Sequence, residues 1–134
     1  MNGVIKKHEL TREDKEQDRI RHVDVCDANT GPIFLACRYP AELLTLMEEW
    51  KDTHVPVYDF TSDDEITHRV WIVDEEETIR TIDSLFGGIS SIYIADGHHR
   101  AASAVKVGQK KRAEHPDYTG KEEFNFFPVS GISV

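Results

Sequence analysis

The sequence predicts one α/β domain, in which a mixed sheet is flanked by helices. Two observations carry this prediction. Short apolar runs alternate along the chain with segments whose apolar residues recur at helical spacing. The run IFLAC at residues 33–37 is continuously apolar, which is typical of a strand covered on both faces. An α+β arrangement of the same elements also fits the pattern.

The first part of the chain is expected to contain two helices, one on each side of this buried strand. A polar helix is expected over residues 11–28, with Thr11 as its N-cap and Asp14 as the acid of a variant capping box. After the strand, Pro40 suits the first position of a helix that continues to about Trp50.

The rest of the chain alternates between strand and helix patterns. The expected elements are strands at 55–60 and 66–73, a helix at 75–86, a strand at 90–95, a helix at 100–107 and a strand at 124–134. Pro56 places the first of these strands at a sheet edge. Asp74 is the expected N-cap of its helix, and Gly108 is the expected end of the last one. The basic residues 110–112 are then expected to lie in a loop.

The charge argues against a general nucleic-acid binder. The 134 residues carry 16 Lys and Arg and 25 Asp and Glu, for a net charge of -9, whereas binding to phosphate backbones needs a basic face. The acid is concentrated in residues 51–95, which leaves residues 96–134 close to neutral and suitable for an anion site. No stretch approaches the ~20 apolar residues that span a bilayer. Together with two cysteines in no paired spacing, this predicts a cytoplasmic protein with no membrane partner.

The segment Asp96-Gly97-His98-His99-Arg100 is the most informative feature of the sequence. It joins a predicted strand to a predicted helix, and the unpaired N–H groups at a helix start can bind an anion. Arg100 can grip phosphate with two hydrogen bonds. The histidines can donate hydrogen bonds or transfer a proton. Two alternatives stay open: a solvated Asp–Gly turn in which Asp96 caps the helix, and a metal site.

The DGHHR segment is part of the longer block IYIADGHHRAASA at 92–104. Other blocks are GVIKKHELT at 3–11, Asp18-Arg19, GPIF at 31–34, and DFT at 59–61 followed by HRVW at 68–71. In this order along the chain, the blocks resemble one microbial family, domain of unknown function one-zero-one-five. The family is similar in fold to the ParB/sulfiredoxin superfamily, where a strand–G-x-x-R–helix element binds nucleotide phosphates, and to a free serine kinase. Members of the family are much longer than this chain, so the resemblance implies that the 134 residues are a partial, single-domain fragment.

The resemblance implies roles for particular residues. Gly97, His98, His99 and Arg100 would contact the phosphates of ADP or ATP, and Asp96 would contact Mg²⁺ or the substrate. Asp96, His98, His99 and Glu9 are the candidate catalytic residues. Lys7, His8 and Arg69 are candidates for substrate contact or support of the site. From the residues alone, positions 7–9 also fit a solvated charged turn, and Arg69 also fits an ion pair with a nearby carboxylate.

Three functions compete. The first is the nucleotide-phosphate-binding part of a kinase that acts on the hydroxyl group of a small molecule, such as an amino acid. Because the acidic base of related kinases lies in a portion with no match here, this fragment is expected to be inactive alone. The second is a non-enzymatic nucleotide-sensing module of ParB-like type, and a homo-oligomer is compatible with it. The third is a His-dependent metallohydrolase.

Overall fold

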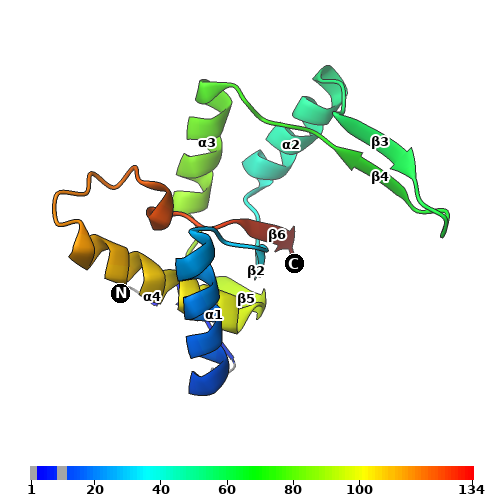
Figure 1. Ribbon diagram of the computed structural model, residues 1–134. Coiled ribbons are helices and arrows are strands. Elements are labelled where there is room, and N and C mark those ends of the chain that lie inside the picture. The colour runs from blue at the N-terminus through cyan, green and yellow to red at the C-terminus, as the bar shows by residue number, and fades with distance from the viewer. Residues whose placement is uncertain (1–2, 9–11) are drawn as a thin grey trace. The chain divides into compact units, whose positions relative to one another are not determined.

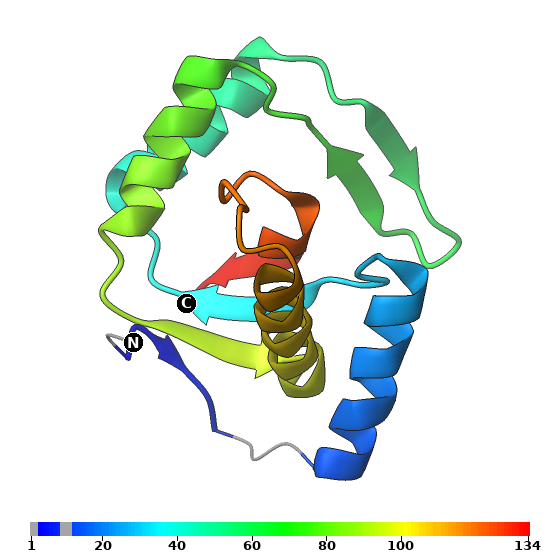
Figure 2. The ribbon, with the colours of Figure 1, turned by 60° about the vertical axis from the view of Figure 1, so that its left-hand side comes forward.

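The computed structural model describes residues 3–8 and 12–134, and it divides the chain into two compact units. The first unit comprises Met1–Cys37 and Ser91–Val134, and the second comprises Arg38–Ser90. Figures 1 and 2 show the course of the chain. The expectation of a single domain stays a prediction, and the two units are described separately below.

The first unit contains a mixed four-stranded sheet. Its strands are β1 (Ile5–Lys6), β2 (Ile33–Cys37), β5 (Ile92–Asp96) and β6 (Val129–Ser133), in the spatial order β1-β5-β2-β6. β5 runs parallel to β1 and antiparallel to β2, and β6 runs parallel to β2. The mixed sheet with its helices confirms the predicted α/β class.

Two helices of this unit, α1 (Glu13–Cys26) and α4 (His98–Glu114), pack against each other, and α4 also contacts β2. A short 3-10 helix, η1 (Glu123–Asn125), packs against α4. The apolar core lies between sheet and helices and contains Ile33, Cys37, Ile94, Ala104 and Val107.

Polar side chains contribute to the contact between α1 and α4. Glu16 is buried and forms an ion pair with Lys106. Lys110 Nζ lies 2.6 Å from Asp24 Oδ2, and this contact lowers the pKa of Asp24 and raises that of Lys110. The earlier residue of α1, Glu16, pairs with the earlier residue of α4, Lys106, and the later residue Asp24 pairs with the later residue Lys110. The two helices therefore run in the same general direction, with their N-termini at the same end (Figure 2).

The second unit consists of two helices and a hairpin. The helices are α2 (Ala41–Thr53) and α3 (Glu76–Gly87), and the antiparallel hairpin is made of β3 (Tyr58–Thr61) and β4 (Thr67–Val70). Leu43 and Trp50 of α2 are buried, and Trp50 Nε1 donates a hydrogen bond to the Ile72 carbonyl.

The largest error in the sequence prediction concerns α4. It begins at His98 and continues past Gly108 to Glu114, so residues 110–112 are helical and do not form a loop. A Cβ on Gly108 would lie 2.9 Å from the Phe124 carbonyl oxygen. Gly108 therefore allows the 123–128 segment to approach the helix closely, and it does not end the helix.

Other boundaries also differ from the predictions. α1 begins at Glu13 with Arg12 as its N-cap, and Thr11 lies outside the described residues. The N-cap of α3 is Glu75, one residue after Asp74. Residues 124–128 do not belong to the last strand, which begins at Val129. Among the described residues, no helix is long and apolar enough to cross a membrane.

Candidate functional site

The turn between β5 and α4 depends on Gly97. Its φ of +88° lies in the left-handed region, where a side chain costs free energy. A Cβ at this position would also lie 3.1 Å from both Nε and Nη2 of Arg100. Gly97 therefore lets the chain turn sharply and lets the Arg100 guanidinium lie directly against the turn.

The start of α4 carries backbone N–H groups that lie ahead of the helical hydrogen bonds. The first hydrogen bond of the helix is donated by Ala101 N–H to the Gly97 carbonyl. The N–H groups of His98, His99 and Arg100 therefore precede the helical hydrogen-bond ladder, at the positive end of the helix dipole. Such a helix start favours an anion.

The two adjacent histidines have different environments. The His98 side chain is buried, and its ring meets the His8 ring edge-on, with 4.5 Å between the centroids. His99 is half-buried, and its Nδ1 is a buried atom without a hydrogen-bond partner among the described residues. His99 is also fixed through its backbone, because Ser103 Oγ donates to the His99 carbonyl at 2.6 Å.

Arg100 connects the strand end to the helix. Its Nη2 donates to Asp96 Oδ2 at 3.0 Å, whereas its Nε is buried and has no hydrogen-bond partner within the described part of the chain. Asp96 is largely exposed, with 76% of its side chain accessible. The guanidinium is thus held beside the helix start with part of its donor capacity unused.

These residues line a cavity of about 540 Å³ to which α1 also contributes. The contributing residues are Asp14, Lys15, Asp18 and Arg19 from α1 and Asp96, Gly97, His98, His99 and Arg100 from the β5–α4 junction. Three cationic side chains therefore face the same space as three carboxylates. Asp14 pairs with Arg12 at 2.8 Å, which takes up part of that negative charge.

The sequence predicts no role for Lys15 or Arg19, and Arg19 stands out only as part of the family block Asp18-Arg19. Lys15 and Arg19 are four residues apart, so a helix places both on one face. That spacing could have identified a basic face on an otherwise polar helix, but nothing local indicated that the face lies beside residues 97–100.

The other predicted site residues fall in different places. His8 contacts His98, and Lys7 beside it is exposed. Glu9 lies outside the described residues, so its catalytic role stays a prediction. Arg69 lies on β4 in the second unit, where its Nε is 3.1 Å from Asp59 Oδ2. The sequence had left open an ion pair between Arg69 and a nearby carboxylate, and the structure contains one. A substrate role for Arg69 stays a prediction.

Within residues 3–8 and 12–134, no group of three or more His, Cys, Asp and Glu side chains is arranged to hold a metal ion. Mg²⁺, however, often binds through one or two carboxylates together with the phosphates of a substrate. The exposed carboxylate of Asp96, at the edge of the cavity, fits that kind of site.

Comparison with known proteins identifies the family. The family described as "Protein of unknown function (DUF1015)" matches residues 1–132, which is nearly the whole chain. The chain belongs to the DUF1015 family. Neither a curated protein nor a solved structure matches it significantly. Membership confirms the resemblance seen in the DGHHR segment and the other blocks, and the description of the family assigns no ligand or reaction.

Proposed function

We propose that this DUF1015 chain binds the phosphate groups of a nucleotide, ADP or ATP, at the start of α4, as part of a kinase-like protein acting on a small hydroxyl compound. The observation that carries the proposal is the convergence of Arg100, Arg19 and Lys15 on the cavity that is also lined by the first residues of α4.

The donors of this cavity suit a polyphosphate better than a single carboxylate. Backbone N–H groups and an arginine fork are the usual partners of phosphate oxygens. The His99 Nδ1 and Arg100 Nε atoms are buried without partners in the described structure. Burial of an unsatisfied polar group costs free energy, so both side chains would gain from a rearrangement that brings these atoms to a bound phosphate.

Mg²⁺ is the proposed companion of the nucleotide. The cavity holds Asp14, Asp18 and Asp96 beside its cations, so a bare polyphosphate would meet both signs of charge. A divalent cation bound to Asp96 and to phosphate oxygens would turn the Asp96 carboxylate from a repulsive group into a ligand.

Phosphoryl transfer is proposed as the chemistry of the whole protein, because it depends mainly on positioned cations and a positioned acceptor. His98 and His99 are the proposed proton-transfer groups in this chain. The second candidate function is nucleotide sensing without turnover, since the same phosphate contacts would serve it. The free thiols of Cys26 and Cys37 fit the proposed cytoplasmic location.

Calorimetric titration with pyrophosphate, ADP, ATP and CTP, with and without Mg²⁺, tests the proposal. We expect Arg100→Ala to weaken binding of every phosphate ligand at least tenfold, because a charge-assisted contact is lost. Arg80→Ala is the matched control, because Arg80 is an exposed arginine on α3 that pairs with Glu76. Unchanged affinity in Arg100→Ala would show that the site is assigned wrongly.

A second measurement separates the two candidate functions. Incubation of the chain with ATP, Mg²⁺ and a mixture of hydroxyl amino acids, followed by mass spectrometry, detects any phosphorylated product. A nucleotide-dependent change in oligomer size would favour the sensing module, whereas absence of product from this chain alone is expected under both functions. Phosphorylated product would favour the kinase.

A further inference from the structure

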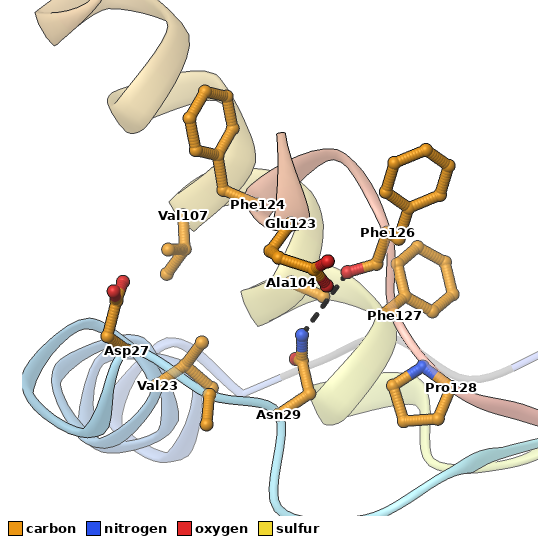
Figure 3. Close-up of a pocket in the computed structure, with 11 residues that line it drawn as sticks. Val23, Asp27, Asn29, Ala104, Val107, Glu123, Phe124, Phe126, Phe127 and Pro128 are labelled. Carbon is orange, nitrogen blue, oxygen red and sulfur yellow. Dashed lines mark hydrogen bonds between the residues drawn. The ribbon is translucent and has the colours of Figure 1, made fainter. Parts of the chain in front are cut away.

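A second cavity of about 560 Å³ lies beside the same two helices (Figure 3). It is formed by the end of α1, the middle of α4 and the segment around η1. Its lining residues are Val23, Asp27, Ala28, Asn29, Ala104, Val107, Glu123, Phe124, Phe126, Phe127 and Pro128. The walls are mainly apolar and aromatic, and the polar side chains are confined to Asp27, Asn29 and Glu123.

A third cavity, of about 20 Å³, shares lining residues with both the aromatic cavity and the candidate phosphate site. Arg19 and Arg100 line both the third cavity and the phosphate site. Val23, Asn29 and Phe127 line both the third cavity and the aromatic cavity. The three spaces therefore follow one another along the paired helices α1 and α4.

The spacing along α4 fits a nucleotide. Arg100 belongs to the phosphate site, whereas Ala104 and Val107 line the aromatic cavity. At about 1.5 Å per residue, these positions lie about 6 Å and about 10 Å further along the helix axis. The phosphates and the base of an extended nucleoside diphosphate are separated by a comparable distance.

The chemistry of the aromatic cavity fits a flat base that carries N–H donors. Figure 3 shows the rings of Phe126 and Phe127 on one side and the side chains of Asn29 and Glu123 reaching toward each other. Asn29 Nδ2 donates to the Phe126 carbonyl at 3.4 Å, so the free atom of that amide is its acceptor oxygen. A carboxylate and an amide oxygen both require donors on the ligand.

We infer that this aromatic cavity binds the base of the nucleotide and selects bases with an exocyclic amino group, such as adenine, over uracil. The inference rests on the proposed function, because the phosphates must occupy the start of α4. Stacking on phenylalanine rings supplies affinity for any base. Glu123 and Asn29 supply the selectivity, because the carbonyl oxygens of uracil would face acceptors with no proton between them.

Titration with pyrophosphate, ADP and UDP tests this inference on the wild-type chain and on Asn29→Ala and Glu123→Gln. We expect ADP to bind at least tenfold more tightly than pyrophosphate, and UDP to gain much less. Glu123→Gln offers a donor as well as an acceptor, so the preference for ADP over UDP should fall about tenfold. Neither variant should change the affinity for pyrophosphate. Glu49→Gln, at an exposed position on α2, is the control.

The outcomes separate this inference from the proposed function. If pyrophosphate binds but ADP binds no more tightly, the phosphate site stands and the base site is wrong. If ADP binds more tightly but both variants leave its affinity and the ADP-to-UDP ratio unchanged, the base lies elsewhere. If pyrophosphate does not bind, the proposed function fails and the base assignment fails with it.

Discussion

The Arg100 guanidinium donates a hydrogen bond to the Asp96 carboxylate across the Gly97 turn, with 3.0 Å between Nη2 and Oδ2. The two residues are four positions apart and stand at the end of β5 and the start of α4. Asp96 thus holds the cation beside the helix start and occupies one of the donors that a phosphate would use. Under the proposed function, a phosphate would either use the remaining donors of Arg100 or displace Asp96 from Nη2.

Removing the charge of Asp96 should therefore have opposite effects with and without metal. Without Mg²⁺, Asp96→Asn should raise the affinity for pyrophosphate several-fold, because a repulsive charge is lost and Arg100 is released. With Mg²⁺, the gain should disappear, because the proposed carboxylate ligand of the metal is lost. Calorimetry under both conditions checks this. A weaker affinity of the variant in the absence of Mg²⁺ would contradict the arrangement.

Gly97→Ala should reduce both stability and phosphate affinity. We expect a stability loss of about 1–2 kcal/mol from the left-handed backbone conformation, and the new Cβ would push Arg100 away. Gly120→Ala is the matched control, because Gly120 has a φ of +93° but open space around it. Denaturant unfolding should show a loss in both variants, while titration with pyrophosphate should show a loss in Gly97→Ala alone. Equal pyrophosphate affinity in the two variants would refute the role of Gly97.

Ser103 lies in the contact between the two helices and is fully buried. Its hydroxyl donates to the His99 carbonyl at 2.6 Å. Ser103→Leu should overpack this contact and cost about 1–3 kcal/mol of unfolding free energy. Val105→Leu, at a 40% exposed position of the same helix, should change stability little. Urea unfolding of both variants measures the difference, and similar stabilities would mean that the helices do not pack closely at Ser103.

The loop before η1 should lose its structure only in strong acid. Glu122 accepts hydrogen bonds from the Thr119 and Gly120 N–H groups at 2.7 and 2.9 Å and from the Thr119 hydroxyl at 2.8 Å. The backbone hydrogen bond from Thr119 is the main cause that lowers the pKa of Glu122 from 4.5 to about 2.

Because this pKa is lower in the folded chain, the contribution of Glu122 is complete above about pH 4.5 and is lost as the pH falls toward 2. The amide shifts of Thr119 and Gly120, followed by NMR from about pH 6 down to about pH 1, should move with a midpoint near 2. Glu122→Gln should abolish this transition. A midpoint at the ordinary carboxyl pKa would show that the hydrogen bonds are not formed.

Local sequence signals identified most of the fold. The continuous apolar run at 33–37 gave β2 with its bounds, and the DGHHR segment was placed correctly at a strand–helix junction. β1 was missed because it has only two residues, Ile5 and Lys6, and pairs with β5 far along the chain. Gly108 was misinterpreted because a glycine that ends a helix and a glycine that admits another segment look alike in sequence.

The candidate site was predictable only in part, because some of its residues are contiguous in the sequence and others come together only through helix packing. Residues 96–100 are contiguous, so their shared chemistry is visible in the sequence. Lys15 and Arg19 join them only because α1 packs beside α4, and that packing depends on polar contacts such as Glu16 with Lys106. An amphipathic pattern would have predicted the contact, but α1 is polar, and its Val25 is 77% exposed.

A crystal structure of the chain with ADP and Mg²⁺ tests the central claim most directly. The account predicts phosphate density within hydrogen-bonding distance of the N–H groups of residues 98–100, with the Arg100 guanidinium turned toward the phosphate and away from Asp96. Nucleotide density elsewhere on the chain, with the Arg100–Asp96 hydrogen bond intact and the start of α4 empty, would contradict it.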